Sequence, residues 1–174
     1  MSDAYPSSPR SERPGLDQEI ASAMRFLIDA ADNPKPYYYN VPEDFLTPAI
    51  FFPQPEITSR GDTLKTYALE FSMFVKFFDK DTQSAHQRAF AALSALQYRH
   101  CVVPLIDKDG ALTGRGFRLN DPSMRSVDDG AVHLTIMWDS ARPYFEPKAI
   151  KMVTYHTNMW VKSAYEGAVD QIGG

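Results

Sequence analysis

The residues of this sequence that could do chemistry lie closest together in the stretch AVHLTIMWDSARPYFEP, residues 131–147. It brings a His, a Thr, an Asp and an Arg within ten residues, and such side chains serve in general acid–base catalysis. Its apolar residues, however, fall at every second position, as in a half-buried β-strand; they are Val132, Leu134, Ile136 and Trp138. His133 and Asp139 would then lie about 20 Å apart along the strand. We therefore interpret the stretch as part of a sheet, in which the apolar face matters and the polar residues do not.

Metal binding, cofactor binding and catalysis are not predicted elsewhere in the chain. The histidines form no HxxxH pattern and the single Cys101 forms no CxxC, so a zinc site has no ligand set close in sequence. The turn Asp107–Gly110 begins like a calcium loop, but its glycine comes too early for an EF-hand. Gly114–Gly116 is a lone GxG without the rest of a dinucleotide fingerprint. We expect a protein that is not an enzyme and that holds no metal and no cofactor.

Arg60, Gly61 and Asp62 spell the tripeptide RGD, which in an exported protein could bind an integrin. We expect the tip of a β-hairpin instead, because glycine tolerates positive φ and charged side chains face water at such turns. The first fifteen residues contain no apolar segment of a signal peptide. A single cysteine excludes an internal disulfide and fits a reducing compartment.

Length and composition predict a folded chain with a core. Of the 174 residues, 44% are hydrophobic and 23% are charged, which is ordinary for a globular domain. We expect residues 1–15 to form a disordered arm and residues 16–174 to form a single domain. The net charge of −4 and the absence of a basic block argue against sequence-specific reading of nucleic acid. No apolar run is long enough to span a membrane.

Two helices are predicted from apolar stripes with helical spacing. The first runs from Leu16 and ends at Asn33-Pro34. The second is capped by Asp79, Asp81 or Thr82 and continues to about Tyr98.

A long β-hairpin is predicted between these helices, from Ala49 to Phe78. Its return arm, TYALEFSMFVKFF, alternates over thirteen residues, which extend about 43 Å. A strand of that length is expected to project past its own core. Residues 35–48, rich in Pro and Tyr, are expected to be an irregular loop.

Further strands are predicted after the second helix, over Cys101–Ile106, Gly114–Leu119 and Ala131–Trp138, with two turn signals in the connection 120–130. A last strand, Lys148–Trp160, has apolar residues on both faces, which indicates double burial or sharing with a neighbour. Strands segregated from helices predict an α+β fold: a mostly antiparallel sheet with two helices packed on one face and a long projecting β-hairpin.

Four phrases of the sequence, TPAIFFPQPEI, TYALEFSMFVKFF, AHQRAFAALSAL and DDGAVHLTIMWDSARPY, resemble tail terminator (tail completion) proteins of long-tailed bacteriophages. The resemblance covers roughly residues 16–160 and also rests on the order of the elements. It implies a non-enzymatic virion subunit that forms a hexameric ring on the last ring of the tail tube. Such a ring stops tube polymerisation and offers a surface to the head connector.

The same resemblance implies the partners and the location. The partners are further copies of the chain, the tail tube protein and the head-tail connector, with no membrane. Genomic DNA passes through the lumen without sequence-specific binding. Six copies with a net charge of −4 carry −24, and an acidic lumen would repel DNA phosphate. The location is the head-proximal end of the tail in the virion, after assembly in the host cytoplasm.

Contacts between subunits are expected at two places. One is the hairpin tip, with Arg60, Asp62 and Lys65; the other is the last strand, with Val153 and Tyr155. Two alternatives stay open. The chain could be another neck or tail subunit, such as a connector or tube protein, or an α+β protein that binds a small apolar ligand among its many Phe and Tyr side chains.

Overall fold

The computed structural model describes residues 16–128 and 130–144 of the chain, which belong to one compact unit that ends at Tyr144. The helices and strands of this part are, in chain order, α1 (Leu16–Ala30), β1 (Lys35–Tyr38), β2 (Ala49–Phe52), β3 (Glu56–Gly61), β4 (Thr66–Phe78), α2 (Thr82–Tyr98), β5 (Val102–Ile106), β6 (Leu112–Asp128) and β7 (Ala131–Pro143). The predicted arm 1–15 and the predicted last strand, with Val153 and Tyr155, lie outside the described residues. The prediction of a single domain over residues 16–174 stays a prediction.

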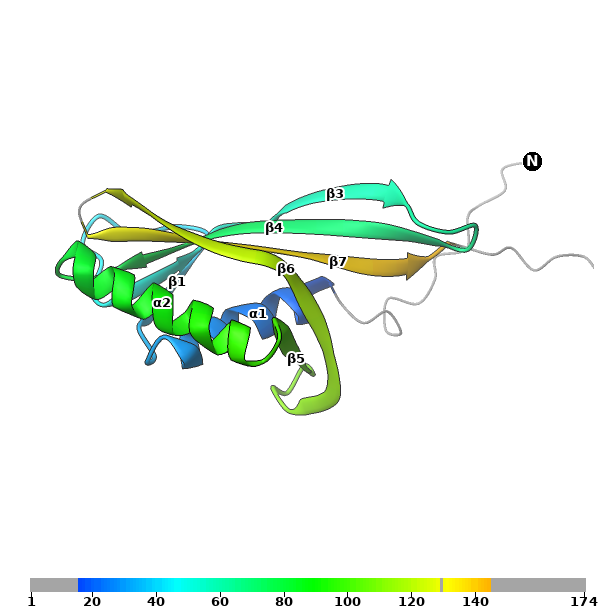
Figure 1. The fold of residues 1–174 in the computed structure, drawn as a ribbon, viewed down its shortest axis with the longest axis horizontal. Helices are drawn as coiled ribbons and strands as arrows, with labels where there is room; N and C mark the ends of the chain where they lie inside the picture. Colours follow the sequence, from blue (N-terminus) through cyan, green and yellow to red (C-terminus); the bar gives the residue numbers. More distant parts are fainter. Residues whose placement is uncertain (1–15, 129, 145–174) are drawn as a thin grey trace, which may run out of the picture. The chain divides into compact units, whose positions relative to one another are not determined.

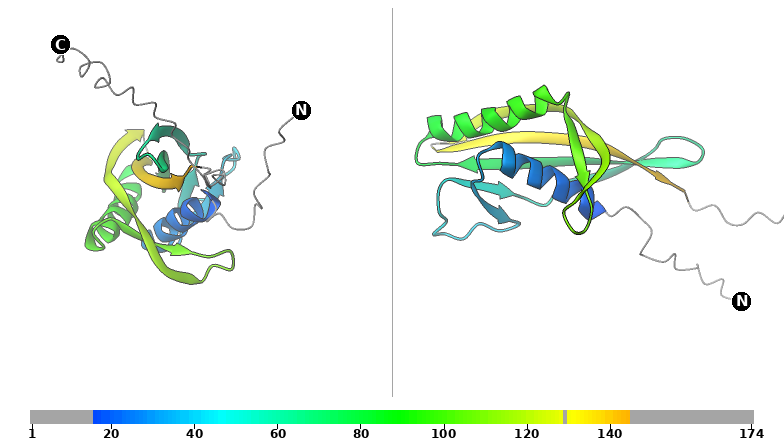
Figure 2. Two further views of the ribbon diagram at one scale, coloured as in Figure 1. Left: turned by 90° about the vertical axis from the view of Figure 1, so that its right-hand side faces the viewer. Right: turned by 90° about the horizontal axis from the view of Figure 1, so that it is seen from below.

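The strands form a sheet in the order β1-β2-β4-β7-β6-β5, and β3 pairs with β4 beside β2. All neighbouring pairs are antiparallel except β1 and β2. The centre of the sheet is the β4–β7 pair, which keeps one register over its whole length, from Thr66 opposite Pro143 to Phe78 opposite Ala131. Both helices lie on the same face of the sheet (Figure 1, Figure 2). The predicted α+β fold with a mostly antiparallel sheet is therefore confirmed.

Helix α1 has the predicted apolar stripe, with Ala23, Met24 and Leu27 buried. It ends where Asp32 and Asn33 adopt positive φ angles of 64° and 50°. Both residue types tolerate this left-handed conformation better than most. The chain then turns back toward the sheet.

Helix α2 begins at the N-cap Asp81, whose carboxylate accepts a hydrogen bond from the backbone N–H of Ser84 at 2.8 Å. That bond, together with one from the Ser84 hydroxyl, lowers the pKa of the Asp81 carboxyl. On its inner face the buried residues are mostly alanines: Ala85, Ala89, Ala92 and Leu96. Because alanine side chains are short, the helix can lie close to the sheet.

The core lies between the helices and the inner face of β4 and β7. The alternation predicted for these strands is confirmed, since Phe71, Met73, Val75, Phe77, Val132, Leu134, Ile136 and Trp138 are all buried. Trp138 stacks on Phe71 across the strand pair, with ring centres 4.8 Å apart and planes 3° apart. Phe117 of β6 contacts the same indole ring, with centres 5.7 Å apart.

The hairpin projects as predicted, although three strands form the projection. The end of the sheet formed by β3, β4 and β7 extends past both helices (Figure 1). The first arm of the hairpin is split into β2 and β3 by Pro53-Gln54-Pro55, and both parts pair with β4. Prolines end a strand because they cannot donate to its ladder.

The prediction of an irregular loop over residues 35–48 is wrong for its first part, because Lys35–Tyr38 forms β1, parallel to β2. The backbone N–H groups of Lys35 and Tyr39 donate to the carbonyl oxygens of Pro48 and Phe52, each at 2.9 Å. Alternate residues of a strand point their N–H groups to opposite sides. Pro36 therefore faces the open edge, where no donor is needed.

The predicted strands Gly114–Leu119 and Ala131–Trp138 are confirmed as parts of β6 and β7, but the prediction of a connection over residues 120–130 is wrong for most of its length. Leu112–Asp128 is one strand, β6, which pairs first with β5 and then with β7. The Asp121-Pro122 signal marks a β-bulge inside it: the register with β7 shifts between Asn120 and Ser123, and Asp121 has a positive φ of 40°. A bulge bends a strand without ending it.

Candidate interaction surfaces

His133 and Asp139 lie on the outer face of the sheet, opposite Lys76 and Glu70 of β4. Their separate register positions exclude a direct acid–base pair, as the sequence predicts. Among the described residues, His, Cys, Asp and Glu side chains form no group of three or more that could hold a metal ion. In this part of the chain no helix has the length and apolar character to cross a membrane.

The polar residues at the end of β7 do matter, which corrects the expectation for the opening stretch. Glu19 of α1 accepts hydrogen bonds from Trp138 Nε1 at 3.1 Å, Ser140 Oγ at 2.7 Å and an Arg142 guanidinium nitrogen at 3.0 Å. The Glu19 and Arg142 side chains are only 14% and 12% exposed. This cluster fixes the first turns of α1 on the projecting end of β7. Positions 138, 140 and 142 share the inner face by strand alternation, which was the available signal for it.

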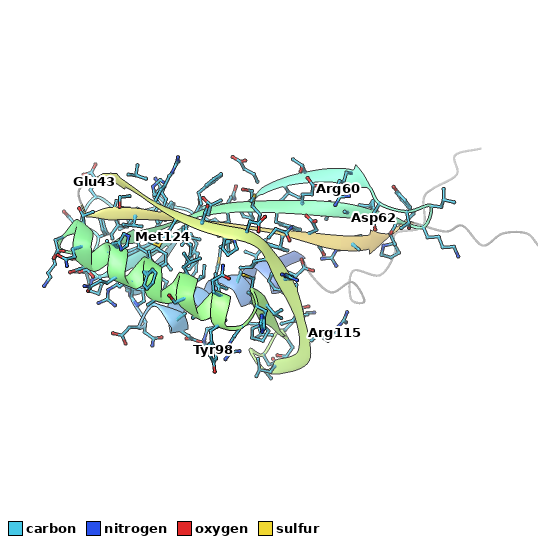
Figure 3. All side chains as sticks on the ribbon, in the orientation of Figure 1. Glu43, Arg60, Asp62, Tyr98, Arg115 and Met124 are labelled. Atoms are coloured by element: carbon cyan, nitrogen blue, oxygen red, sulfur yellow. The ribbon has the colours of Figure 1, made fainter. Side chains whose placement is uncertain are left out.

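At the hairpin, Arg60 belongs to β3 rather than to the turn, and its guanidinium lies over the outer face of the sheet (Figure 3). It pairs with the carboxylate of Glu70 and lies 3.5 Å from that of Asp139. The hydrogen bond to Glu70 raises the pKa of Arg60. Arg60, Gly61 and Asp62 are all exposed, but Arg60 makes its contacts within the sheet and Asp62 makes its contacts within the turn.

The turn that follows β3 is held by its own side chains. Asp62 accepts a hydrogen bond from the Thr66 hydroxyl at 2.9 Å, and the Thr63 hydroxyl oxygen accepts from the Thr66 backbone N–H at 3.0 Å. Leu64 and Lys65 between them are exposed. A turn that is already ordered loses little conformational entropy when it binds. The tip therefore presents a fixed apolar and charged surface.

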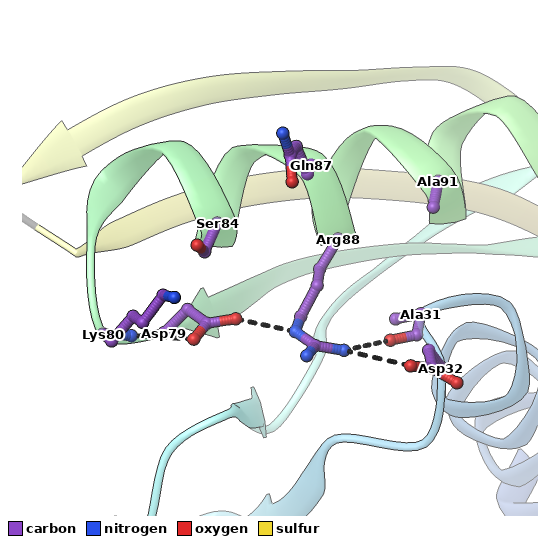
Figure 4. Close-up of a pocket in the computed structure, with 8 residues that line it drawn as sticks. All are labelled: Ala31, Asp32, Asp79, Lys80, Ser84, Gln87, Arg88 and Ala91. Atoms are coloured by element: carbon purple, nitrogen blue, oxygen red, sulfur yellow. Dashed lines mark hydrogen bonds and ion pairs between the residues drawn. The ribbon is translucent and has the colours of Figure 1, made fainter.

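Figure 4 shows a hollow beside the N-terminal half of α2, where charged groups meet. Arg88 donates to Asp79 at 2.7 Å and to the Ala31 carbonyl at 3.0 Å, and it lies 3.8 Å from the Asp32 carboxylate. Arg88 thus joins the end of α1 to the start of α2. We interpret this cluster as structural, because its contacts hold two elements together.

Several of the large aromatic side chains that could have lined an apolar ligand pocket lie in the core instead. Phe52, Phe71 and Phe77 are fully buried in the core. A second hollow, between α1, α2 and β5, is lined by both charged and apolar side chains, including Arg25, Asp29 and Ile106. Among the described residues, Phe52, Phe71, Phe77 and Trp138 therefore belong to the core, whereas Tyr39, Phe90 and Tyr98 are exposed on the surface.

Two proteins of Bacillus subtilis are similar in sequence to this chain. No protein-family model matches the chain. The protein YqbJ of Bacillus subtilis (strain 168) is 30% identical over 125 residues, which are 72% of this chain and 85% of YqbJ. The protein XkdJ of the phage-like element PBSX, from the same organism, is 26% identical over 147 residues, which are 84% of this chain and 100% of XkdJ.

A chain of the virion of a native gene transfer agent particle is 14% identical, with a TM-score of 0.43, over 78% of this chain and 98% of that chain. Of these three proteins, YqbJ has the highest sequence identity to this chain, and the match covers 85% of the length of YqbJ. The chain therefore belongs to the family of YqbJ.

Proposed function

We propose that the protein is a non-enzymatic structural subunit of a phage or phage-like particle, and that its specific role is tail termination. The observation that carries this proposal is the similarity to XkdJ of the phage-like element PBSX over the whole length of XkdJ. The fold supports a structural role, since the charged clusters described above join elements to one another. The specific role in tail termination rests on the four sequence phrases that resemble tail terminator proteins.

In this proposal six copies form a ring on the last ring of the tail tube. The projecting end of the sheet supplies a surface for that assembly, because all six residues of β3 are exposed. Strands at a sheet edge can pair with a strand of another chain. Asp62 and Lys65 at the tip would contact the neighbouring subunit, with Arg60 positioned beside them. Val153 and Tyr155, which lie outside the described residues, would form a second contact between subunits.

The ring would bind the tail tube protein on one side and the head-tail connector on the other, at the head-proximal end of the tail, after assembly in the host cytoplasm. DNA would pass through its lumen. Six copies carry a net charge of −24, and a negative lumen repels phosphate. Weak adhesion of this kind lets DNA slide through without sequence-specific contacts.

Negative-stain electron microscopy tests the proposal on the purified full chain, alone and mixed with tail tubes of the same phage element. We expect rings that cap one end of the tubes, or free rings at high concentration. A protein that associates neither with itself nor with tubes, at any concentration or salt tested, would contradict the proposal. A chain that polymerises into tubes, or that binds only to heads, would favour a tube or connector subunit.

A further inference from the structure

We propose that neighbouring copies in the ring join head to tail, the acidic loop Glu43–Leu46 of one copy docking into a basic and apolar hollow on the next. The hollow is lined by Arg99, Val102, Leu112 and Arg115. This inference rests on the proposed ring and adds to it the contact that joins one copy to the next. The occupant of the hollow is thus a second copy of this chain.

The hollow lies where the end of α2 meets β5 and β6. It has a volume of about 440 Å³. Leu112 is 72% exposed beside it, and Val102 is also exposed. Residues 98–118 contain four basic and two acidic side chains, whereas the whole chain has a net charge of −4. Exposed apolar side chains ringed by positive charge favour a partner with an apolar anchor and carboxylates.

The loop between β1 and β2 has those properties. Glu43 and Asp44 are exposed and adjacent, and Leu46 is 69% exposed. Phe45 holds the loop in place, with its ring centre 6.2 Å from that of Tyr37 and 4.9 Å from that of Phe78. The backbone N–H of Leu46 donates to the Tyr37 hydroxyl at 3.0 Å. The loop is therefore held at Phe45 and at the Leu46 backbone, beside its exposed apolar anchor and carboxylates.

The loop and the hollow lie at opposite ends of α2, so one copy cannot join its own two surfaces. Phe45 contacts Phe78, which precedes the N-cap Asp81, whereas Arg99 is the C-cap of the same helix. Figure 3 shows Glu43 and Arg115 far apart along the helix direction. A helix of this length spans about 25 Å.

Two different complementary surfaces on one chain make a heterologous contact, which closes into a ring when the rotation between copies allows it. In the two hollows described above, Arg88 and Arg25 are already paired with carboxylates of the same copy. Arg88 pairs with Asp79 and Asp32, and Arg25 pairs with Asp29. Their charges are used within the copy that carries them.

A disulfide trap tests the contact in the full chain. Leu46→Cys and Leu112→Cys are combined in a chain that also carries Cys101→Ala. A second version keeps the buried Cys101, so that the test does not depend on whether the Cys101→Ala chain folds. A disulfide needs Cα atoms within about 7 Å, so these cysteines can join only between copies. We expect a ladder of linked copies after oxidation. The matched control replaces the exposed Phe90 of α2 in place of Leu46, because Phe90 belongs to none of the proposed contact surfaces. A yield no higher than in this control would overturn the inference.

Charge reversal in the same trap gives the second test. Glu43→Arg places an arginine against Arg115, and Arg115→Glu places a glutamate against Glu43, so each variant alone should link at least about ten-fold less. In a mixture of the two variants, opposite charges meet at every contact between unlike copies. The mixture should therefore restore the yield. Lys108→Glu makes the same charge change outside the hollow and should have no effect.

Equal yields in all variants, or a mixture as poor as its components, would overturn the head-to-tail contact. Rings that still cap tubes in that case would leave the proposed function standing and would mean that another surface joins the copies. If the unchanged protein bound to tail tubes without forming rings on them, that result would instead refute the proposed function.

Discussion

At the scale of single residues, the most consequential group is the carboxylate of Glu19, because it receives donors from three residues of β7. Glu19 and Arg142 are both mostly buried. Removing one member of a mostly buried ion pair is costly, because the remaining charge loses a compensating partner. The fit between α1 and the projecting end of the sheet therefore depends on this one side chain.

We expect Glu19→Ala to lower the free energy of unfolding by about 3 kcal/mol. Asp29→Ala is the matched control on the same helix, because it breaks an exposed pair with Arg25 and should cost about 0.5 kcal/mol or less. Urea denaturation of both variants gives the comparison. Equal losses would show that the Glu19 cluster does not stabilise the fold.

Trp138 and His133 offer a second comparison within one strand. Trp138 is fully buried, so Trp138→Ala should cost about 3–5 kcal/mol, a large share of the stability of an ordinary domain. His133 is only half-buried, so His133→Ala should cost about 1 kcal/mol or less and leave assembly intact. Thermal melts by circular dichroism and an assembly assay decide between strand and site. A folded His133→Ala protein without any function would mean that the strand contains a functional site.

At the scale of elements, the start of α2 depends on an ionised cap. A carboxyl group whose pKa is lowered by folding stabilises the native state above its unfolded pKa, and this stabilisation is lost as the pH falls through the folded pKa. Asp81 is such a group. We expect Asp81→Ala to lower the melting temperature at neutral pH, and the difference from the unchanged protein to shrink in acid. A difference that stays constant to pH values below the carboxylate range would count against this role of the cap.

The tip of the hairpin should matter for assembly and little for folding. The pairs of Arg60 with Glu70 and Asp139 are exposed, and exposed ion pairs contribute little to stability. The double variant Arg60→Ala/Asp62→Ala should melt close to the unchanged protein and form fewer rings. Normal ring formation by this variant would exclude the tip from the interface.

Short-range sequence patterns predict the helices. The features that these patterns do not predict depend on pairing between residues far apart in the chain. The stripe of α2 and its cap Asp81 are visible within a few residues. Strand β1 is not predicted because its only support is a parallel neighbour more than ten residues away. The predicted strand Gly114–Leu119 ends too early because Asp-Pro is common in turns and in bulges alike. The Glu19–Arg142 pair joins residues 123 positions apart, so alternation could assign its face but not its partner.

At the scale of the whole molecule, the described unit has three surfaces that suit an assembly. They are the projecting sheet end, the acidic loop and the basic hollow. The first supports pairing along strand edges, and the other two support head-to-tail contact. Closed rings satisfy every such contact, whereas a lone copy leaves all of them facing water.

The growth of tail tubes tests the central claim most directly. Tube protein from the same phage element is polymerised from seeds, and the purified full chain is added during growth while tube length is followed by electron microscopy. The account predicts that elongation stops and that the stopped tubes carry a ring at one end. Tubes that continue to grow at the same rate, with bare ends, in the presence of excess protein would contradict it.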